Sequence, residues 1–527
     1  MRGGARGVPR WRRARFAARG GRWSSVIAGP RASIHAKRPL IKVDSVSLRV
    51  WRRPDRVRRR RGGMNNPAQR PVAAAGAVDF DRYIDDRIEE GVFAVHRDIF
   101  RDESLFELEM KYIFESNWVF LCHASQVAAP HDFYTTHIGR QPVLVTRNGA
   151  GELKAFLNTC THKGSLVCLT RAGNRKFHSC TYHGWTFDSA GRCVSIKDHA
   201  EAAYTPAFEA NGHDLQAVPK LGEYRGWVFA SLNPDVVPLE QHLGDARVFI
   251  DLLVEQAPDG MELVRGNASY TFPGNWKLQV ENCLDGYHLN IAHKGFIEIT
   301  RRRIARAGAA YKGPDIEAMF GENLKTGSFG LKNGHALFFT ENPAPEFRPL
   351  WSQREQLAAR LGAGRAKWLL QYGRNLTVFP NVQCTDNAVI GQFRVLRPLG
   401  TALTEMEIYC WVPVGEPPAA RRQRLRQYED FFNISSTGTP DDVGAYRNCQ
   451  EGLQARAVDW LHGHGRGLKS MVRGANDYAR ELGIEPETSS AGPLNMSDET
   501  LFHANYRQWL RLMKEGQRRA RDAGELG

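Results

Sequence analysis

The spacing of hydrophobic positions divides the chain into three parts. Residues 106–120 repeat apolar side chains every three or four positions, which predicts an amphipathic helix, and helical patterning of this kind begins at Phe80. From 133 to 232, short apolar runs alternate with turn residues, which predicts a small all-β module. Beyond Pro238, long helical segments are mixed with strands such as 405–412. We therefore expect two domains of the α+β class.

Two β-hairpins are predicted within the all-β module. In the first, 143–146 and 153–157 flank the turn sequence Asn-Gly-Ala-Gly. In the second, 185–187 and 193–196 flank Asp-Ser-Ala-Gly. Glycine together with Asn or Asp supplies the backbone conformations that tight turns need, so the strands of each pair are expected to run antiparallel.

Composition excludes disordered and membrane-spanning proteins. The chain has 527 residues, of which 42% are hydrophobic, enough to form a sizeable buried core. No run approaches the ~18 consecutive apolar residues of a membrane span, so no membrane partner is expected. The nine cysteines are odd in number and thinly spread, and no export signal precedes them. This usage favours a reducing compartment and a cytoplasmic location.

The positive charge is concentrated at the N-terminus. The net charge of the chain is +15, but residues 1–63 hold 20 basic residues and only two acidic ones. The other 464 residues carry 52 basic and 55 acidic residues, a net charge of −3, so no nucleic-acid partner is expected. We expect 1–63 to be a disordered or non-native extension, with Met64 as the start of the protein. An organellar transit peptide and a basic arm for nucleic acid are the alternatives.

A first metal-binding constellation lies in the all-β module. A Cys-x-His motif is followed after 17 residues by a Cys-x2-His motif, and each is expected at the tip of a predicted hairpin. The four residues are Cys160, His162, Cys180 and His183. Two thiolates and two imidazoles are the ligands of a Rieske [2Fe–2S] centre, and the glycines that follow let backbone N–H groups approach sulfur. A tetrahedral zinc site and four ordinary core residues are the alternatives.

A second constellation lies on a predicted helix over 275–293. Asp285 and His288 are three residues apart and share a helix face, whereas His288 and His293 are five apart and would point about 140° from each other. A π-bulge or a break in the helix would bring both imidazoles to one metal. Two imidazoles and one carboxylate form the facial triad of non-haem Fe(II) oxygenases. The alternative is a regular helix whose histidines are hydrogen-bonded polar residues.

The carboxylate that completes such a triad cannot be chosen from spacing. Glu281 and Asp285 lie on the same predicted helix, and Asp441 and Asp442 follow a predicted helix over 419–432. The sequence Thr-Pro-Asp-Asp at 439–442 is also typical of a helix N-terminus, with Thr as the cap. Asp441 and Asp442 are therefore interpreted first as capping residues.

Two other polar groups have a functional and a plainer interpretation. Arg301, Arg302 and Arg303 could supply a cation for a carboxylate substrate, but a solvated basic stretch is favoured. His462 and His464 could mimic a metal pair, but a surface loop is favoured.

The combined motifs resemble those of one enzyme family. The patterns are Cys-x-His-x17-Cys-x2-His-Gly-Trp and Asn-Trp-Lys-x3-Glu-Asn-x2-Asp-x-Tyr-His-x4-His. Together they are similar to the large (α) subunits of aromatic-ring-hydroxylating dioxygenases, from Asp79 to the C-terminal region. Within that family the chain most resembles the benzoate/anthranilate/toluate 1,2-dioxygenase group.

The resemblance implies a fold and a set of ligands. It implies an all-β Rieske domain over 117–236 and a helix-grip-type catalytic domain with an antiparallel sheet over 237–527, to which 64–116 adds an N-terminal helical part. The implied cluster ligands are Cys160, His162, Cys180 and His183, and the implied ligands of a mononuclear Fe(II) are His288, His293 and Asp442. Asp285 is implied to link His183 of a neighbouring subunit to His288. Lys163 departs from the arginine usual after the first cluster histidine.

The resemblance also implies a reaction and partners. The expected reaction adds both atoms of O2 to a benzoate-like aromatic carboxylate and gives a cis-dihydrodiol. No Gly-x-Gly-x-x-Gly fingerprint follows a predicted strand, so NADH is expected to act indirectly, through a separate FAD/[2Fe–2S] reductase. A small β subunit in an α3β3 assembly, or an α3 ring, is implied. The alternatives are anthranilate as substrate, a Rieske monooxygenase or demethylase, a pure electron carrier and a zinc-containing binding protein.

Overall fold

The computed structural model describes residues 77–387 and 391–525. The extension 1–63 and the start expected at Met64 lie outside these residues. Within the described ranges, no helix is long and apolar enough to cross a membrane. The described residues all belong to one compact unit of the chain.

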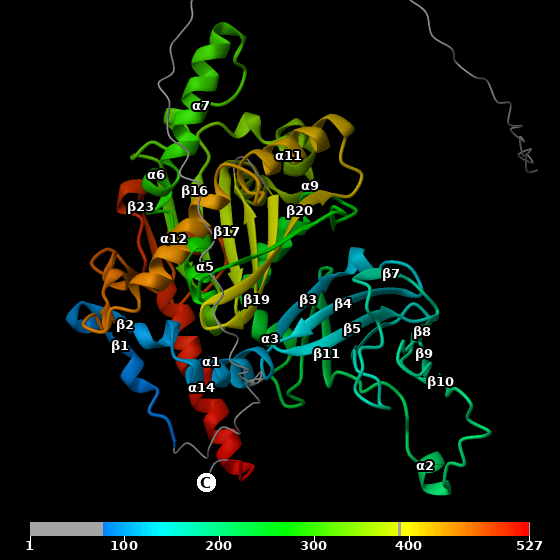
Figure 1. The fold of residues 1–527 in the computed structure, drawn as a ribbon. Coiled ribbons are helices and arrows are strands. Elements are labelled where there is room, and N and C mark those ends of the chain that lie inside the picture. Colours follow the sequence, from blue (N-terminus) through cyan, green and yellow to red (C-terminus); the bar gives the residue numbers. More distant parts are fainter. Residues whose placement is uncertain (1–76, 388–390, 526–527) are drawn as a thin grey trace, which may run out of the picture. The chain divides into compact units, whose positions relative to one another are not determined.

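Small antiparallel sheets make up the part of the chain that carries the Cys/His motifs (Figure 1). The first has the order β6-β5-β4-β7, the second β10-β9-β8 and the third β11-β12-β3. The strands are β3 (Val119–His123), β4 (Asp132–Ile138), β5 (Gln141–Arg147), β6 (Leu153–Leu157), β7 (Ala172–Asn174), β8 (Phe177–Ser179), β9 (Thr186–Asp188), β10 (Cys193–Ser195), β11 (Lys220–Tyr224) and β12 (Trp227–Ser231). One short helix, α2 (Pro206–Ala210), lies between β10 and β11.

Both expected hairpins are confirmed, but the metal motifs are not at their tips. β5 pairs with β6, and β9 pairs with β10, antiparallel in each case. The Cys-x-His motif follows β6, and the Cys-x2-His motif forms the tip of a different hairpin, β8–β9. The strands β7 and β8 are three residues long and largely exposed, so their sequences carry little alternation from which to predict them.

A ten-stranded antiparallel sheet forms the centre of the rest of the chain (Figure 1). Its order is β13-β20-β19-β18-β17-β16-β15-β23-β22, and β14 also pairs with β20. The strands are β13 (Met261–Leu263), β14 (Ala268–Phe272), β15 (Lys325–Gly330), β16 (Ala336–Glu341), β17 (Tyr372–Val378), β18 (Val382–Asp386), β19 (Gly391–Gly400), β20 (Leu403–Pro413), β22 (Val472–Arg473) and β23 (Thr488–Pro493). β20 contains the expected strand 405–412.

Helices pack against this sheet and against one another. α5 packs on β16 to β19, and α12 contacts α5, α6 and β14. The helices are α3 (Leu239–Leu243), α4 (Ala246–Val254), α5 (Trp276–Leu284), α6 (Leu289–Ala292), α7 (Lys294–Ala307), α8 (Ile316–Met319), α9 (Arg354–Leu361), α10 (Ala363–Gln371), α11 (Pro418–Phe431), α12 (Thr439–Gly452), α13 (Asp477–Leu482) and α14 (Phe502–Asp522). The sheets and helices together confirm the α+β class.

The first described segment contains strands in place of the helix that was predicted there. β1 (Ile84–Arg87) and β2 (Val92–His96) form a hairpin that pairs with β21 (Trp460–Leu461), where helical patterning had been predicted from Phe80. The helix expected over 106–120 is α1 (Glu103–Glu109) continued by a π-helical turn to Phe114. The apolar run then continues into β3, whose five residues are all buried, so the hydrophobic pattern alone does not mark where the helix ends.

Candidate metal centres

Two loops that close in the same way carry the Cys-x-His and Cys-x2-His motifs. In each loop the backbone N–H of the cysteine donates to the carbonyl five residues later, at 2.8 Å. The N–H of the glycine four residues later donates back to the cysteine carbonyl, at 2.9 Å. This holds for Cys160 with Gly164 and for Cys180 with Gly184, and both glycines have left-handed backbone, with φ of 72° and 76°. A residue with a Cβ rarely adopts this conformation, so glycine closes each loop.

The cysteines of these loops are buried and the histidines lie at the surface. Cys160 and Cys180 are 2% and 4% exposed, whereas the rings of His162 and His183 are half-buried, with centroids 4.6 Å apart. Burial works against the Cys180 thiolate, but backbone N–H groups of the loop donate to its sulfur and lower the pKa of Cys180. The buried Trp185 stacks on the ring of His162 at 4.9 Å and fixes its orientation.

The spacing of these four donors weighs against a single zinc ion. Zinc bonds of ~2.0–2.3 Å in tetrahedral geometry place all four donor atoms within ~3.8 Å of one another. In the part of the chain that the structure describes, no three of these four residues have donor atoms within 4.8 Å of each other. A binuclear cluster, which bonds thiolates on one iron and imidazoles on the other, needs this wider arrangement.

The single helix expected over 275–293 is replaced by α5, α6 and the start of α7. α5 ends at Leu284, and Asp285 caps it with extended backbone (φ −90°, ψ 119°). His288 then precedes the single turn of α6, and His293 leaves helical geometry between α6 and α7 (φ −93°, ψ 22°). The chain therefore leaves helical geometry before His288 and again at His293, instead of running as one regular helix over 275–293.

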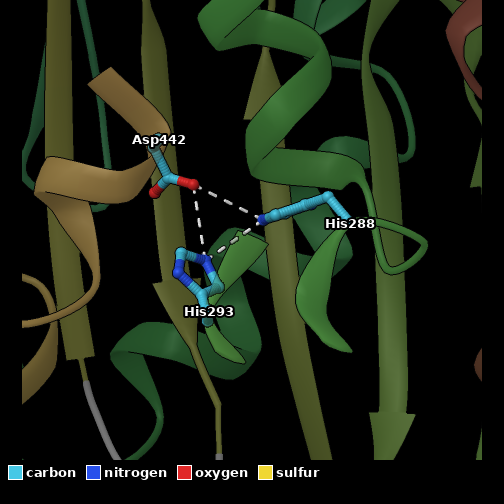
Figure 2. A group of neighbouring side chains, drawn as sticks. All are labelled: His288, His293 and Asp442. Atoms are coloured by element: carbon cyan, nitrogen blue, oxygen red, sulfur yellow. Dashed lines mark hydrogen bonds and ion pairs between the residues drawn. The ribbon is translucent and has the colours of Figure 1, made fainter. Parts of the chain in front are cut away.

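His288, His293 and Asp442 point their donor atoms at one another (Figure 2). The two Nε2 atoms are 3.3 Å apart, and Oδ1 of Asp442 lies 3.5 Å from Nε2 of His288 and 3.4 Å from Nε2 of His293. Two ligand atoms ~2.1 Å from a common ion and ~90–110° apart are separated by ~3.0–3.4 Å. The three donors therefore fit three vertices around one metal ion and leave its other coordination positions open.

Two neighbouring side chains orient this group. Oδ2 of Asp285 lies 3.0 Å from Nδ1 of His288, which places the ring proton on Nδ1 and turns the Nε2 lone pair toward the triad. Nδ2 of Asn282 donates to Oδ1 of Asp442 at 3.1 Å. Burial lowers the pKa of His293; the pKa of His288 is raised because Asp285 and Asp442 outweigh its burial. Asn282 was not predicted from the sequence as a site residue, although it stands in the Glu-Asn-x2-Asp motif that also contains Asp285.

The start of α12 does not use the capping arrangement that the sequence suggested. The N-cap is Gly438, and Thr439 is the first helical residue, with its hydroxyl donating to the carbonyl of Phe432 at 3.0 Å. Asp442 is 5% exposed and faces the two histidines. Asp441 is more exposed, and its Oδ2 lies 3.5 Å from Nδ1 of His293. The geometry thus brings Asp442 into the triad and leaves Asp441 outside it.

The structure agrees with the plainer interpretation of Arg301 and contradicts the surface-loop interpretation of His464. Arg301 lies on an exposed part of α7 and pairs with Glu298 at 2.8 Å and Glu317 at 2.7 Å, as a solvated basic stretch would. His464, expected on a surface loop, is instead 5% exposed, and its Nε2 lies 3.0 Å from Oε1 of Glu281. This buried contact was missed because the two residues are far apart in the sequence.

A cavity of about 440 Å³ opens beside the triad. Its walls include aromatic and aliphatic side chains from several elements, among them Phe296, Met319, Phe320, Phe338, Phe431 and Phe432. His288, His293 and Asp442 line the same cavity. The site therefore combines three convergent metal-type donors with an apolar chamber large enough for a small aromatic molecule.

Comparisons with known proteins identify the two domains that contain these residues. Residues 117–216 match the Rieske [2Fe-2S] domain, and residues 261–515 match the ring hydroxylating alpha subunit (catalytic domain). The chain is 41% identical to toluate 1,2-dioxygenase subunit alpha of Pseudomonas putida over 448 residues, 84% of this chain and 96% of that protein. It is 42% identical to 2-halobenzoate 1,2-dioxygenase large subunit of Burkholderia cepacia, over 81% of this chain and 90% of that protein. Naphthalene 1,2-dioxygenase from Rhodococcus sp. has the same fold, with a TM-score of 0.66, 24% identity and coverage of 80% and 94%.

Proposed function

Because this chain belongs to the family of large (α) subunits of aromatic-ring-hydroxylating dioxygenases, we propose that it adds both atoms of O2 to a benzoate-like carboxylate and forms a cis-dihydrodiol. Membership of this family makes the chain an oxidoreductase with a Rieske [2Fe–2S] domain. The observation that carries the proposal is the convergence of His288, His293 and Asp442 on one side of an apolar cavity. The two relatives named above act on toluate and 2-halobenzoate, both aromatic carboxylates.

The geometry of each site supports the proposed ligands. Mononuclear Fe(II) would be held by His288, His293 and Asp442, whose three donor atoms fit one ion and leave open positions toward the cavity. The cluster would be held by the two thiolates and two imidazoles of the paired loops. When bound, the iron supplies oxygen activation and the cluster supplies storage of one electron.

Residues of the chain prepare the site for this chemistry. The Asp285 carboxylate holds the ring proton of His288 on Nδ1, so Nε2 is free to bind metal. Asn282 holds Oδ1 of Asp442 in place by its 3.1 Å hydrogen bond. The aromatic walls of the cavity exclude water and give the substrate ring a surface on which to pack.

We further propose that the cluster of one subunit serves the iron of a neighbour. Exposed apolar side chains lie beside each centre: Tyr182 (62%) and Leu169 (64%) near the cluster loops, and Tyr287 (54%) and Ile291 (82%) near Asp285. In the proposed assembly the neighbouring subunit would cover these side chains. Asp285, 20% exposed in its side chain and bonded to His288, would pass electrons between the two centres.

The remaining partners belong to the same proposal. An α3 ring of this kind requires at least three copies of the chain, and a small β subunit would complete an α3β3 assembly. Electrons from NADH would arrive through a separate FAD/[2Fe–2S] reductase.

Metal analysis of the anaerobically purified full chain tests the two sites. The expected result is about three irons and two acid-labile sulfides per chain, with a Rieske signal in the EPR spectrum after dithionite reduction. Asp442→Asn should lose about one iron and keep the sulfide, whereas the matched variant Asp441→Asn should keep all three irons. Zinc without sulfide, or equal iron loss in both variants, would contradict the proposed ligands.

Product analysis tests the reaction without the reductase. Dithionite-reduced protein is mixed with benzoate and ¹⁸O₂, and the product is identified by mass spectrometry. The expected product is a dihydrodiol that carries two ¹⁸O atoms. A product with one ¹⁸O atom would indicate a monooxygenase, and conversion of anthranilate to catechol in preference to benzoate oxidation would identify the other substrate.

A further inference from the structure

The cavity beside the triad contains one buried cation. Two arginines line it, Arg303 from α7 and Arg394 from β19. Their surroundings differ. The side chain of Arg303 is 57% exposed and lies 3.9 Å from Asp430, so solvent and a carboxylate already satisfy it. Arg394 is 5% exposed, and within the described ranges no carboxylate lies within 4.0 Å of its guanidinium.

The guanidinium of Arg394 is fixed in place but incompletely bonded. Its Nε donates to Oε1 of Gln392 at 2.5 Å, and its plane lies 5.0 Å from the ring centre of Phe432. Gln392 is itself held, because its Nε2 donates to the carbonyl of Phe432 at 3.0 Å. Among the described residues, the hydrogen bond of the Arg394 side chain is the one from Nε, and the terminal nitrogens are left for another acceptor. These nitrogens form the edge that binds carboxylates through two parallel hydrogen bonds.

A buried guanidinium without an ion pair is costly unless an anion satisfies it. An arginine remains charged in proteins, and the free energy of holding an unpaired charge in an apolar setting is large. The side chain lines the substrate cavity, so a ligand in that cavity can reach it. Asp442 lines the same cavity but is already directed at the two histidines.

The position of Arg394 also suits attack beside a carboxylate. In a 1,2-dioxygenation of benzoate, one reacting carbon bears the carboxylate, so the anchor for that group must lie close to the metal. Arg394 lines the same cavity as His288 and Asp442. Arg301, considered for this role from the sequence, pairs with two glutamates and is absent from the cavity wall.

We propose that Arg394 binds the substrate carboxylate. Its buried guanidinium then selects aromatic acids over neutral aromatic molecules of the same shape. This assignment rests on the proposed function and names the group that would give it its substrate class. Phe432 and Gln392 position the guanidinium, and the aromatic wall holds the ring.

Binding of a matched pair of ligands tests this assignment. Benzoate and benzamide have the same shape and differ in charge, and their Kd values are measured by calorimetry on the anaerobic, iron-loaded protein. The wild type should prefer benzoate. In Arg394→Gln, benzoate should bind about 10- to 100-fold more weakly, as expected for the loss of a charge-assisted bidentate contact, while benzamide should change less than about twofold. Arg394→Lys should restore part of the preference for benzoate.

Two controls separate this role from a structural one. Arg303→Gln removes the other arginine of the cavity and should leave the ratio of the two Kd values unchanged. Iron and sulfide contents should match those of the wild type, because Arg394 is not a ligand. Equal weakening of both ligands in Arg394→Gln, no preference for benzoate in the wild type, or loss of that preference in Arg303→Gln would overturn the assignment.

The binding result is independent of the reaction. A product with a single ¹⁸O atom would overturn the proposed dioxygenation. The loss of benzoate preference in Arg394→Gln would still support Arg394 as the residue that binds the carboxylate. Conversely, dihydrodiol formation by the wild type, with an unchanged ratio of Kd values in Arg394→Gln, would support the reaction and overturn the assignment of Arg394.

Discussion

A buried ion pair at the start of α5 gives a quantitative prediction about stability. Nζ of Lys277 lies 2.6 Å from Oε1 of Glu109, and the two residues are 3% and 0% exposed. Glu109 also accepts hydrogen bonds from the indole N–H groups of Trp276, at 2.9 Å, and Trp509, at 2.6 Å. This carboxylate therefore joins α1, α5 and α14. The Asn-Trp-Lys sequence that precedes the metal-site motif has a structural role here.

Removal of the lysine should cost several kcal/mol. Breaking a buried ion pair typically costs about 3–5 kcal/mol, because the remaining charge is left without its partner. In Lys277→Met the two indole N–H groups still donate to Glu109, so we expect a loss at the lower end of that range, about 3 kcal/mol. In the double variant with Glu109→Gln the unpaired charge is gone, so at least about 1 kcal/mol should be recovered.

Denaturant unfolding followed by tryptophan fluorescence measures these differences. The matched control is Lys367→Met, which breaks an ion pair with Glu481 at 3.2 Å whose side chains are 40% and 33% exposed; its expected cost is about 0–1 kcal/mol. A loss below about 1 kcal/mol for Lys277→Met would refute the reasoning. A double variant less stable than Lys277→Met would also refute it.

Three further predictions address the metal centres and their surroundings. Asp285→Asn should retain both metals but slow oxidation of the reduced cluster by O2 with benzoate present; an unchanged rate would argue against Asp285 as the link. Cys180→Ser should abolish the visible and EPR signals of the cluster while about one iron per chain remains, and loss of all iron would contradict two separate sites. Burial raises the pKa of Glu499 to about 7, from about 4.5 in the unfolded chain, so its ionisation destabilises the fold as pH rises through this interval. Glu499→Gln should therefore raise Tm more at pH 8.5 than at pH 5.5, and an equal change at both would contradict this cause.

The parts of the fold that the sequence predicted are those with local signals. The two hairpins have turn residues between alternating strands, and α11 and β20 are long enough to show their periods. β1 and β2 were missed because they are short and their third strand, β21, lies far along the chain. The helix at 106–120 was predicted too long because the buried strand β3 continues its apolar run.

The residues of the candidate site also differ in whether a local sequence pattern identifies them. The cysteines and histidines could be found because they form short motifs, and the need for a helix break followed from the angle between His288 and His293. Asp442 could not be chosen by spacing, since its neighbours also fit a helix cap. The role proposed for Arg394 gave no sequence signal, because it depends on a folded cavity in which no described acidic residue pairs with its guanidinium.

The connectivity of the two candidate centres determines when each can form during synthesis. All four proposed cluster ligands lie within 24 consecutive residues, on two loops closed by their own backbone hydrogen bonds. The proposed iron ligands His288 and Asp442 are 154 residues apart, and the strands β15 to β20 lie between them. A growing chain on the ribosome can therefore complete the cluster site long before the iron site. Iron, once bound, would act as a cross-link between α6 and α12 and would stabilise only a catalytic domain that has already closed its sheet.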